Sequence, residues 1–364
     1  MFPPPPARLV GRNNELRVLV QAIRDRGVKR LALVGGGGSG KSLLACALGH
    51  RLRRHFPGGV HWLRVGNWDP TTLFEMMSRR LGVARPAGDS DPFRAGPRRI
   101  RRLVAALTAA GSSLVVLDNH ENDRSLSRFL EDLRAAPVTW VVTARRCLLS
   151  GVEIFPVVPP LATARQSAFP RVSALTVLLR WNPLALDIAD ALVGSGAISL
   201  PALRTWLVKG GVERVAPMMN EDDVVEVRLL VDWAWAHLPA GARRLLAVLA
   251  HCEGDDMDVR SLARIAREVR GAGPALARLE RFRLVQQPLA GRYTVHAVVR
   301  QAVSRRARVP RERYFRHYVA LLERHPDRVD LEQTHLYAAM DHAHATSDLD
   351  SALRLERLLV RLDG

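Results

Sequence analysis

The sequence predicts an α/β fold for the first part of the chain, followed by segments that are almost entirely helical. Two observations lead to this prediction. Short apolar runs alternate with amphipathic helical stretches up to about residue 158, which is typical of a parallel sheet covered by helices. Beyond about residue 161 the alternation stops and helical patterns continue to the end. With 364 residues, 48% of them apolar, the chain has room for several domains with their own cores.

The first part begins with a proline-rich stretch, residues 2–8, which we expect to be a linker. An amphipathic helix follows, with Leu16, Leu19 and Ile23 on one face and Asn13 or Asn14 as its N-cap. The alternating apolar and helical patterns after it predict strands at 30–34, 60–65, 113–117, 138–143 and 152–158, and helices at 41–54, 71–81, 97–110 and 124–134.

The glycine cluster after the first strand reads Gly35-x-x-x-x-Gly40-Lys41-Ser42, which is the pattern of a phosphate-binding P-loop. Its glycines let successive backbone N–H groups point at an anion, its lysine reaches the outer phosphates and its serine hydroxyl can ligate magnesium. The positive end of the following helix dipole adds to the attraction. We therefore expect nucleotide-binding roles for Gly35, Gly37, Gly38, Ser39, Gly40, Lys41, Ser42 and Leu43.

The same glycines also match the dinucleotide fingerprint, as Gly35-x-Gly37-x-x-Gly40. That motif requires an acidic residue about 20 positions further on, at the end of the second strand, to bind a ribose. The second predicted strand instead ends near Arg64, and Gly66 and Asn67 follow. The sequence therefore favours a nucleoside triphosphate site over a dinucleotide site.

Two further residues are expected at the carboxyl edge of the sheet. Asp118 follows the third strand, where it can hold Mg²⁺ together with Ser42, and Arg145 follows the fourth strand, where it can reach the γ-phosphate. We expect catalytic roles for Lys41, Asp118 and Arg145, and metal binding by Ser42 and Asp118. His120 and Glu121 lie either near an attacking water or in a loop that faces solvent, and the sequence leaves both interpretations open.

The composition bears on partners and compartment. The formal net charge is +18, and only three of the 54 basic residues are lysine. Such an arginine-rich surface favours acidic partners, including nucleic acid, although a GC-rich coding bias produces the same composition and the arginines are scattered. The three cysteines lie far apart, which fits a reducing compartment. With neither a signal peptide nor an apolar run long enough for a membrane span, we expect a cytoplasmic protein without membrane association.

The second part of the chain contains Trp181-Asn-Pro-Leu-Ala-Leu186, whose proline should begin or end a helix, and an acidic boundary at Glu221-Asp-Asp223. Four short helices (227–238, 239–250, 259–267 and 274–283) precede two strand-like runs around a turn at Ala290-Gly291, which is a winged-helix outline. Two helical runs, 331–345 and 349–362, resemble one hairpin of a repeat array. One hairpin cannot bury its own apolar face, so we expect either that the array is cut short or that this face docks on the rest of the protein or on a partner.

In this order and spacing, the motifs resemble those of the signal-transducing STAND ATPases, in particular the NB-ARC (AP-ATPase) branch in its bacterial form. Leu9-Val-Gly-Arg12 with Glu15 resembles the adenine-contacting motif, and Leu114–Asn119 and Thr143–Arg145 resemble the magnesium strand and the sensor-1 segment. The resemblance implies that Val10, Gly11, Arg12 and Pro183 contact the adenine nucleotide, and that His296 contacts the ADP β-phosphate.

The resemblance also implies the domain organisation. A P-loop NTPase domain (1–153) is followed by a helical, ARC1-like domain (154–222), a winged-helix domain (223–310) and the start of a TPR-like α-helical repeat region (311–364). Because the nucleotide-binding module begins almost at once, we expect no effector domain before it. Three residues depart from the family pattern, namely Trp181 in place of glycine, Ala297 in place of an acid after the histidine, and Asn119 where many relatives carry a second aspartate.

The function that the resemblance implies is a molecular switch with slow ATP hydrolysis. ADP holds the winged helix against the nucleotide domain, and exchange for ATP releases it so that protomers can assemble. The alternative is a DNA-binding transcriptional regulator that uses the winged helix and basic runs such as Arg98-Arg99 and Arg305-Arg306. A metabolic P-loop kinase fits less well, because the sequence shows no recognisable acceptor site.

Overall fold

The computed structural model describes residues 2–6, 9–66, 68–83, 97–158, 168–212, 224–252, 254, 256–309, 311–329 and 331–363. Within these residues the predicted sheet is present, with five parallel strands in the order β2-β3-β4-β1-β5. The central strands are buried on both faces, as parallel strands between two helical layers must be. The strands are β1 (Arg30–Val34), β2 (Val60–Arg64), β3 (Ser113–His120), β4 (Val138–Ala144) and β5 (Glu153–Pro156).

Helices cover both faces of the sheet, and alternate residues of each strand face them. Leu31 and Leu33 of β1 belong to the core beneath α1 (Asn13–Arg24) and α2 (Lys41–Leu52). Ala32 belongs to the core on the opposite face. That face is covered by α3 (Pro70–Arg80), α4 (Pro97–Ala110) and α5 (Asp123–Asp132), and the 3-10 turn η1 (Arg53–His55) follows α2.

The bounds of β1 and α4 agree with the predicted ones, and β3 runs three residues further than predicted. Two expectations are wrong. The N-cap position of α1 is Arg12, which makes no side-chain capping bond, so neither Asn13 nor Asn14 caps the helix. Residues 2–6 are not a free linker, because Phe2 packs edge-on against His50 and Trp62.

The second part is helical, as expected, and Pro183 begins a helix. The elements after the sheet are η2 (Pro170–Leu175), α7 (Pro183–Gly194) and α8 (Leu200–Lys209). The acidic boundary predicted at 221–223 lies outside the described residues.

Next come α9 (Val225–His237) and α10 (Ala240–His251). A small antiparallel sheet follows, and α11 (Val259–Ala266) and α12 (Ala272–Arg281) lie in the sequence between its first strand and its other two. Its strands are β6 (Met257–Asp258), β7 (Gln286–Leu289) and β8 (Arg292–Thr294), in the order β6-β8-β7. The predicted turn at Gly291 is present, with φ at 74°. The short strand β6 and the helix α13 (Ala297–Ser304) complete what we call the α9–α13 unit.

The chain ends in three helices, of which the sequence patterns predicted the last two. They are α14 (Arg311–Arg324), α15 (Gln333–Ala345) and α16 (Leu349–Asp363), with the turn η3 (Pro326–Arg328) after α14. Helix α14 packs on α15 and α16, so the hairpin docks on another helix of the chain, which agrees with the second of the two alternatives.

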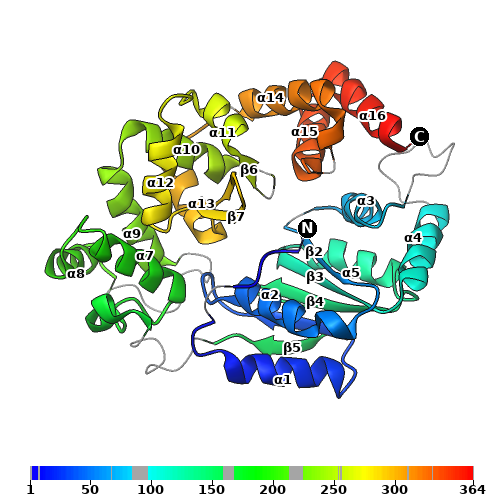
Figure 1. Ribbon diagram of the computed structural model, residues 1–364, viewed down its shortest axis with the longest axis horizontal. Coiled ribbons are helices and arrows are strands. Elements are labelled where there is room, and N and C mark those ends of the chain that lie inside the picture. Colours follow the sequence, from blue (N-terminus) through cyan, green and yellow to red (C-terminus); the bar gives the residue numbers. More distant parts are fainter. Residues whose placement is uncertain are drawn as a thin grey trace.

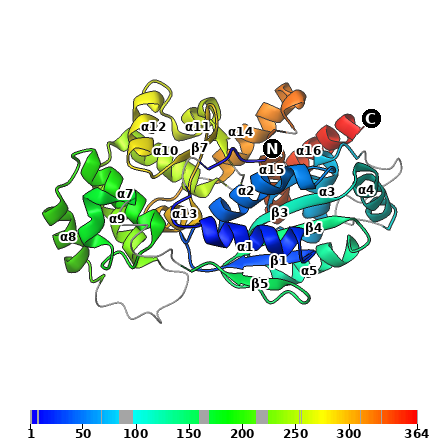
Figure 2. The ribbon, with the colours of Figure 1, turned by 60° about the horizontal axis from the view of Figure 1, so that its bottom comes forward.

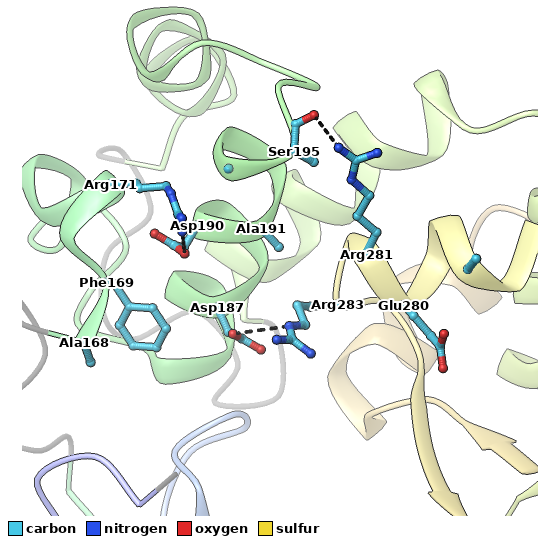
Figure 3. Close-up of a pocket in the computed structure, with 12 residues that line it drawn as sticks. Ala168, Phe169, Arg171, Asp187, Asp190, Ala191, Ser195, Glu280, Arg281 and Arg283 are labelled. Atoms are coloured by element: carbon cyan, nitrogen blue, oxygen red, sulfur yellow. Dashed lines mark hydrogen bonds and ion pairs between the residues drawn. The ribbon is translucent and has the colours of Figure 1, made fainter. Parts of the chain in front are cut away.

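The units follow one another around a ring-like path, as Figures 1 and 2 show. The sheet domain leads to α7 and α8, then to the α9–α13 unit, and the last helices return until α15 lies against α3. Helices α7 and α12 face each other across a polar cavity of 660 Å³ (Figure 3). Arg281 there donates to the Ser195 carbonyl (3.1 Å), and Arg283 lies 3.8 Å from the Asp187 carboxylate. In the part of the chain that the structure describes, no helix is long and apolar enough to cross a membrane.

Candidate functional site

The glycine-rich loop connects β1 to α2 at the carboxyl edge of the sheet. Gly38 and Gly40 have φ values of 76° and 93°, which side chains other than glycine rarely adopt. Gly35 lies so close to β5 that a Cβ there would be 2.6 Å from the Val157 carbonyl oxygen. Helix α2 begins directly after Gly40, at Lys41. The backbone therefore has the turn and the helix N-terminus that a phosphate cradle requires.

Lys41 folds back over this loop. Its Nζ donates to the carbonyl oxygens of Gly35 and Gly36, both at 2.8 Å. Burial and the nearby Arg145 charge lower the pKa of Lys41 to about 8, against the opposing effect of Asp118. An anion in the loop would relieve this excess of positive charge.

Ser42, Asp118 and Thr143 form a connected group of oxygens beside the loop. The Ser42 hydroxyl and the Thr143 hydroxyl each donate to Asp118 Oδ1 at 2.6 Å. The side chains of Ser42 and Asp118 are thus brought together as predicted, and their oxygens are ligands that suit Mg²⁺. Thr143 was predicted only as part of the segment that resembles sensor 1, with no role of its own, although a polar residue near the end of the apolar strand β4 is a signal that could have identified it.

The residues after Asp118 do not converge on the loop in the same way. Asn119 has a φ of 60°, which asparagine tolerates better than most residues, and its N–H donates to the Thr143 hydroxyl (2.9 Å). His120 is buried and hydrogen-bonded to Asp123 (2.7 Å), and the exposed Glu121 accepts from Asn119 (2.8 Å). These contacts give His120 a structural partner at the start of α5.

Arg12 links the segment before α1 to the loop. Its guanidinium is 4% exposed and donates to the carbonyl oxygens of Ser39 (2.7 Å) and Val158 (2.6 Å) and to Glu15 (2.7 Å). Val10 and Gly11 form the turn just before it. The predicted adenine-contacting motif is therefore attached to the P-loop backbone. Leu43, by contrast, is 46% exposed in the first turn of α2.

Asn182, from the Trp-Asn-Pro-Leu-Ala-Leu segment, joins the helical region to the loop. Its Oδ1 accepts from the N–H groups of Leu184 (3.0 Å) and Ala185 (3.2 Å) and so caps α7, while its Nδ2 donates to the Gly37 carbonyl (3.0 Å). Pro183 occupies the first turn of that helix. Trp181 has a φ of 56°, which explains why glycine suits this position and shows that tryptophan is held there under strain.

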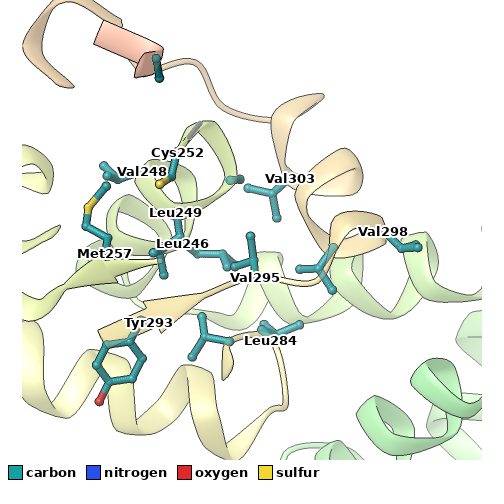
Figure 4. Packing of buried hydrophobic residues seen from close by; sticks show 14 of the residues in the cluster. Leu246, Val248, Leu249, Cys252, Met257, Leu284, Tyr293, Val295, Val298 and Val303 are labelled. Carbon is teal, nitrogen blue, oxygen red and sulfur yellow. The ribbon is translucent and has the colours of Figure 1, made fainter. Parts of the chain in front are cut away.

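His296, in the α9–α13 unit, lies near Lys41 of the P-loop. It caps α13, where its Nδ1 accepts from the Val298 N–H (3.2 Å), and its neighbours Val295 and Val298 are anchored in the apolar core (Figure 4). Burial and the charges of Lys41, Arg64 and Arg145 lower the pKa of His296 to about 4. Because Nδ1 is an acceptor, the ring proton of neutral His296 is on Nε2, which leaves a donor for an anion.

Gly37 is the point at which these units meet. A Cβ at this position would lie 2.7 Å from Val298 and 3.0 Å from Val224, so the loop backbone is directly against the α9–α13 unit. Neither Val298 nor Asn182 was predicted to support the site, because only their positions in space connect them with the loop.

Comparisons with known proteins identify similar sequences and a similar fold. No protein-family model matches the sequence. The regulatory protein AfsR from Streptomyces griseus is 24% identical over 294 residues, and AfsR from Streptomyces coelicolor is 25% identical over 298. Each alignment covers 74% of this chain, but the chain spans only 29% and 28% of the length of these relatives.

Among solved structures, the chain is similar to a STAND protein with a tetratricopeptide repeat sensor from Pyrococcus horikoshii. The TM-score is 0.58 at 16% identity, over 98% of this chain and 53% of that one. The chain therefore has the fold of a STAND ATPase, which confirms at the level of the fold what the order of motifs indicated. The predicted fold class, a P-loop NTPase sheet followed by helical units, is confirmed as well.

The dual role of Asn182 gives a testable prediction. Replacing Asn182 with alanine removes the cap of α7 and the bond to Gly37, so we expect the free energy of unfolding to fall by about 1–2 kcal/mol in urea denaturation. Asn182→Ser keeps a capping hydroxyl that is too short to reach Gly37, and should lose less than half as much. Equal losses in both variants would mean that capping is not what Asn182 contributes.

Proposed function

We propose that the chain is an ADP/ATP-dependent switch, in which the nucleotide in the P-loop decides whether the α9–α13 unit stays against the nucleotide domain. The observation that supports this most directly is that two neighbouring units contact the P-loop at Gly37. The loop that would hold the phosphates touches Val298 and is hydrogen-bonded to Asn182. Any change in what the loop binds acts on both neighbouring units at once.

The proposed ADP-bound state uses the donors already gathered around the loop. The loop N–H groups and Lys41 would hold the phosphates, and His296 would donate from Nε2 to the β-phosphate. Val10, Gly11, Arg12 and Pro183 would border the adenine. A third phosphate adds volume to a loop that Val298 already touches, which would favour release of the α9–α13 unit.

For ATP hydrolysis, Ser42 and Asp118 are the residues that would hold Mg²⁺, which neutralises phosphate charge when bound. Lys41 and Arg145 would stabilise the charge that develops on the transferred phosphoryl group. Asp118 is already oriented by the hydroxyls of Ser42 and Thr143. Asn119 stands where many relatives of the resembled family have a second acid, so we propose that hydrolysis is slow and serves to reset the switch.

The α9–α13 unit has the order of helices and strands that a winged helix requires, and we propose that it is the moving domain. Release would permit self-assembly, with α14–α16 available to a protein partner. The relatives named regulatory proteins support a role in regulation. Direct DNA binding is less well supported, because Arg99 is buried in an ion pair with Glu75 and Arg306 pairs with Asp232.

Nucleotide binding itself is tested by Lys41→Ala. Without the Nζ charge the phosphates lose their main cationic contact, so we expect affinity for ADP to fall by at least about 100-fold, measured by titration calorimetry, while the folded state is retained. An unchanged ADP affinity would rule out the P-loop as the nucleotide site.

The low pKa of His296 predicts a pH dependence. The folded, closed state holds His296 near pKa 4 whereas the unfolded chain has the ordinary value of about 6.5, so the folded state loses stability as pH falls from about 6.5 to 4. Between pH 7 and pH 5, the wild-type protein should lose up to about 2 kcal/mol more unfolding free energy than His296→Gln, measured by urea denaturation. The same pH dependence in both proteins would contradict this placement of His296.

A further inference from the structure

Phe2, Pro3 and Pro4 contact side chains of α2 and β2. The Phe2 ring packs edge-on against His50 (ring centroids 5.1 Å apart) and Trp62 (5.5 Å). The backbone that follows is held by α2, since His50 Nε2 donates to the Pro3 carbonyl (2.8 Å) and the Cys46 thiol lies 3.3 Å from the Pro4 carbonyl oxygen. Ring contacts thus hold the aromatic side chain of Phe2, and hydrogen bonds hold the carbonyl groups of the prolines that follow it.

Gly49 makes room for this anchor. A Cβ on Gly49 would lie 2.3 Å from Phe2 Cζ and 3.1 Å from a Val60 methyl group. No side chain can be added at this helix position while Phe2 keeps its place. The absence of a side chain at this position of α2 therefore leaves the space that the Phe2 ring occupies.

The same stretch of chain is anchored a second time, at the opposite edge of the sheet. Phe2 contacts β2, which is one edge strand, whereas Arg12 donates to Val158, just after the other edge strand β5, and to Ser39 in the P-loop. Five strands span roughly 19 Å from edge to edge, and the ten residues from Phe2 to Arg12 can reach up to about 33 Å. Ten residues are therefore long enough to join the two anchor points.

We propose that Phe2 is a positioning residue for the nucleotide site. Its docking holds one end of a strap, residues 2–6 and 9–12, whose other end is bonded to the P-loop through Arg12 and carries the segment proposed to border the adenine. When the Phe2 ring is released, the strap keeps Arg12 and the contacts of the Pro3 and Pro4 carbonyls but loses its aromatic anchor, and bound nucleotide must supply more of the ordering. Strap docking and nucleotide retention are then linked, and each strengthens the other. This inference rests on the proposed function.

The test measures release of a fluorescent ADP analogue from the full chain. Phe2→Gln removes the ring, and Gly49→Ala displaces it from the other side. Each should release the analogue about tenfold faster than the wild type, which corresponds to about 1.4 kcal/mol. The double variant should be no faster than either single variant, because both changes remove the same contact. Pro5→Ala, at an exposed position of the strap, is the matched control and should release at the wild-type rate.

The outcomes separate this inference from the proposed function. Tight binding with equal release rates in wild type and Phe2→Gln would overturn the positioning role and leave the nucleotide switch standing. Additive effects of Phe2→Gln and Gly49→Ala would also overturn it, since Gly49 would then act through packing on Val60. If the wild-type protein bound no adenine nucleotide, the proposed function and this inference would both fall.

Discussion

The structure depends on one constraint, which is that the P-loop backbone at Gly37 also serves as a contact surface. Its carbonyl accepts a hydrogen bond from Asn182, and its Cα has no room for a side chain beside Val298. Close packing has few intermediate arrangements, so a loop that shifts to accommodate phosphates must either keep these contacts or lose them together. This is the physical basis for treating the loop as a latch between units.

Electrostatics provide a second link between the loop and the α9–α13 unit. Lys41, Arg64 and Arg145 lie close enough to His296 to lower its pKa, and the pKa of Lys41 is lowered as well. Asp118 offsets only part of this positive charge. All three cations belong to the sheet domain, and closure of the α9–α13 unit brings the neutral ring of His296 to them. An anion bound in the loop would accept a hydrogen bond from Nε2 of this ring and would favour the closed arrangement. Nucleotide binding and closure are then coupled through charge as well as through shape.

Sequence reasoning recovered what local patterns determine. The alternation of apolar runs located β1 and the other strands of the sheet, and the P-loop pattern placed Lys41 and Ser42 where the structure has them next to Asp118. It missed features that depend on distant segments meeting in space. The bond between Asn182 and Gly37 joins residues 145 positions apart. The proline-rich stretch was predicted to be a linker because nothing local shows that Phe2 packs against His50 and Trp62.

The most direct test of the switch is the distance between the two units that meet at Gly37, measured with spin labels at the exposed positions Arg17 of α1 and Arg278 of α12. With ADP bound, the labels should keep the separation of the closed arrangement. With a non-hydrolysable ATP analogue, the distance should lengthen and the distribution broaden as the α9–α13 unit leaves the loop. The same distance with both nucleotides would contradict the proposal that phosphates in the P-loop control how the units are arranged.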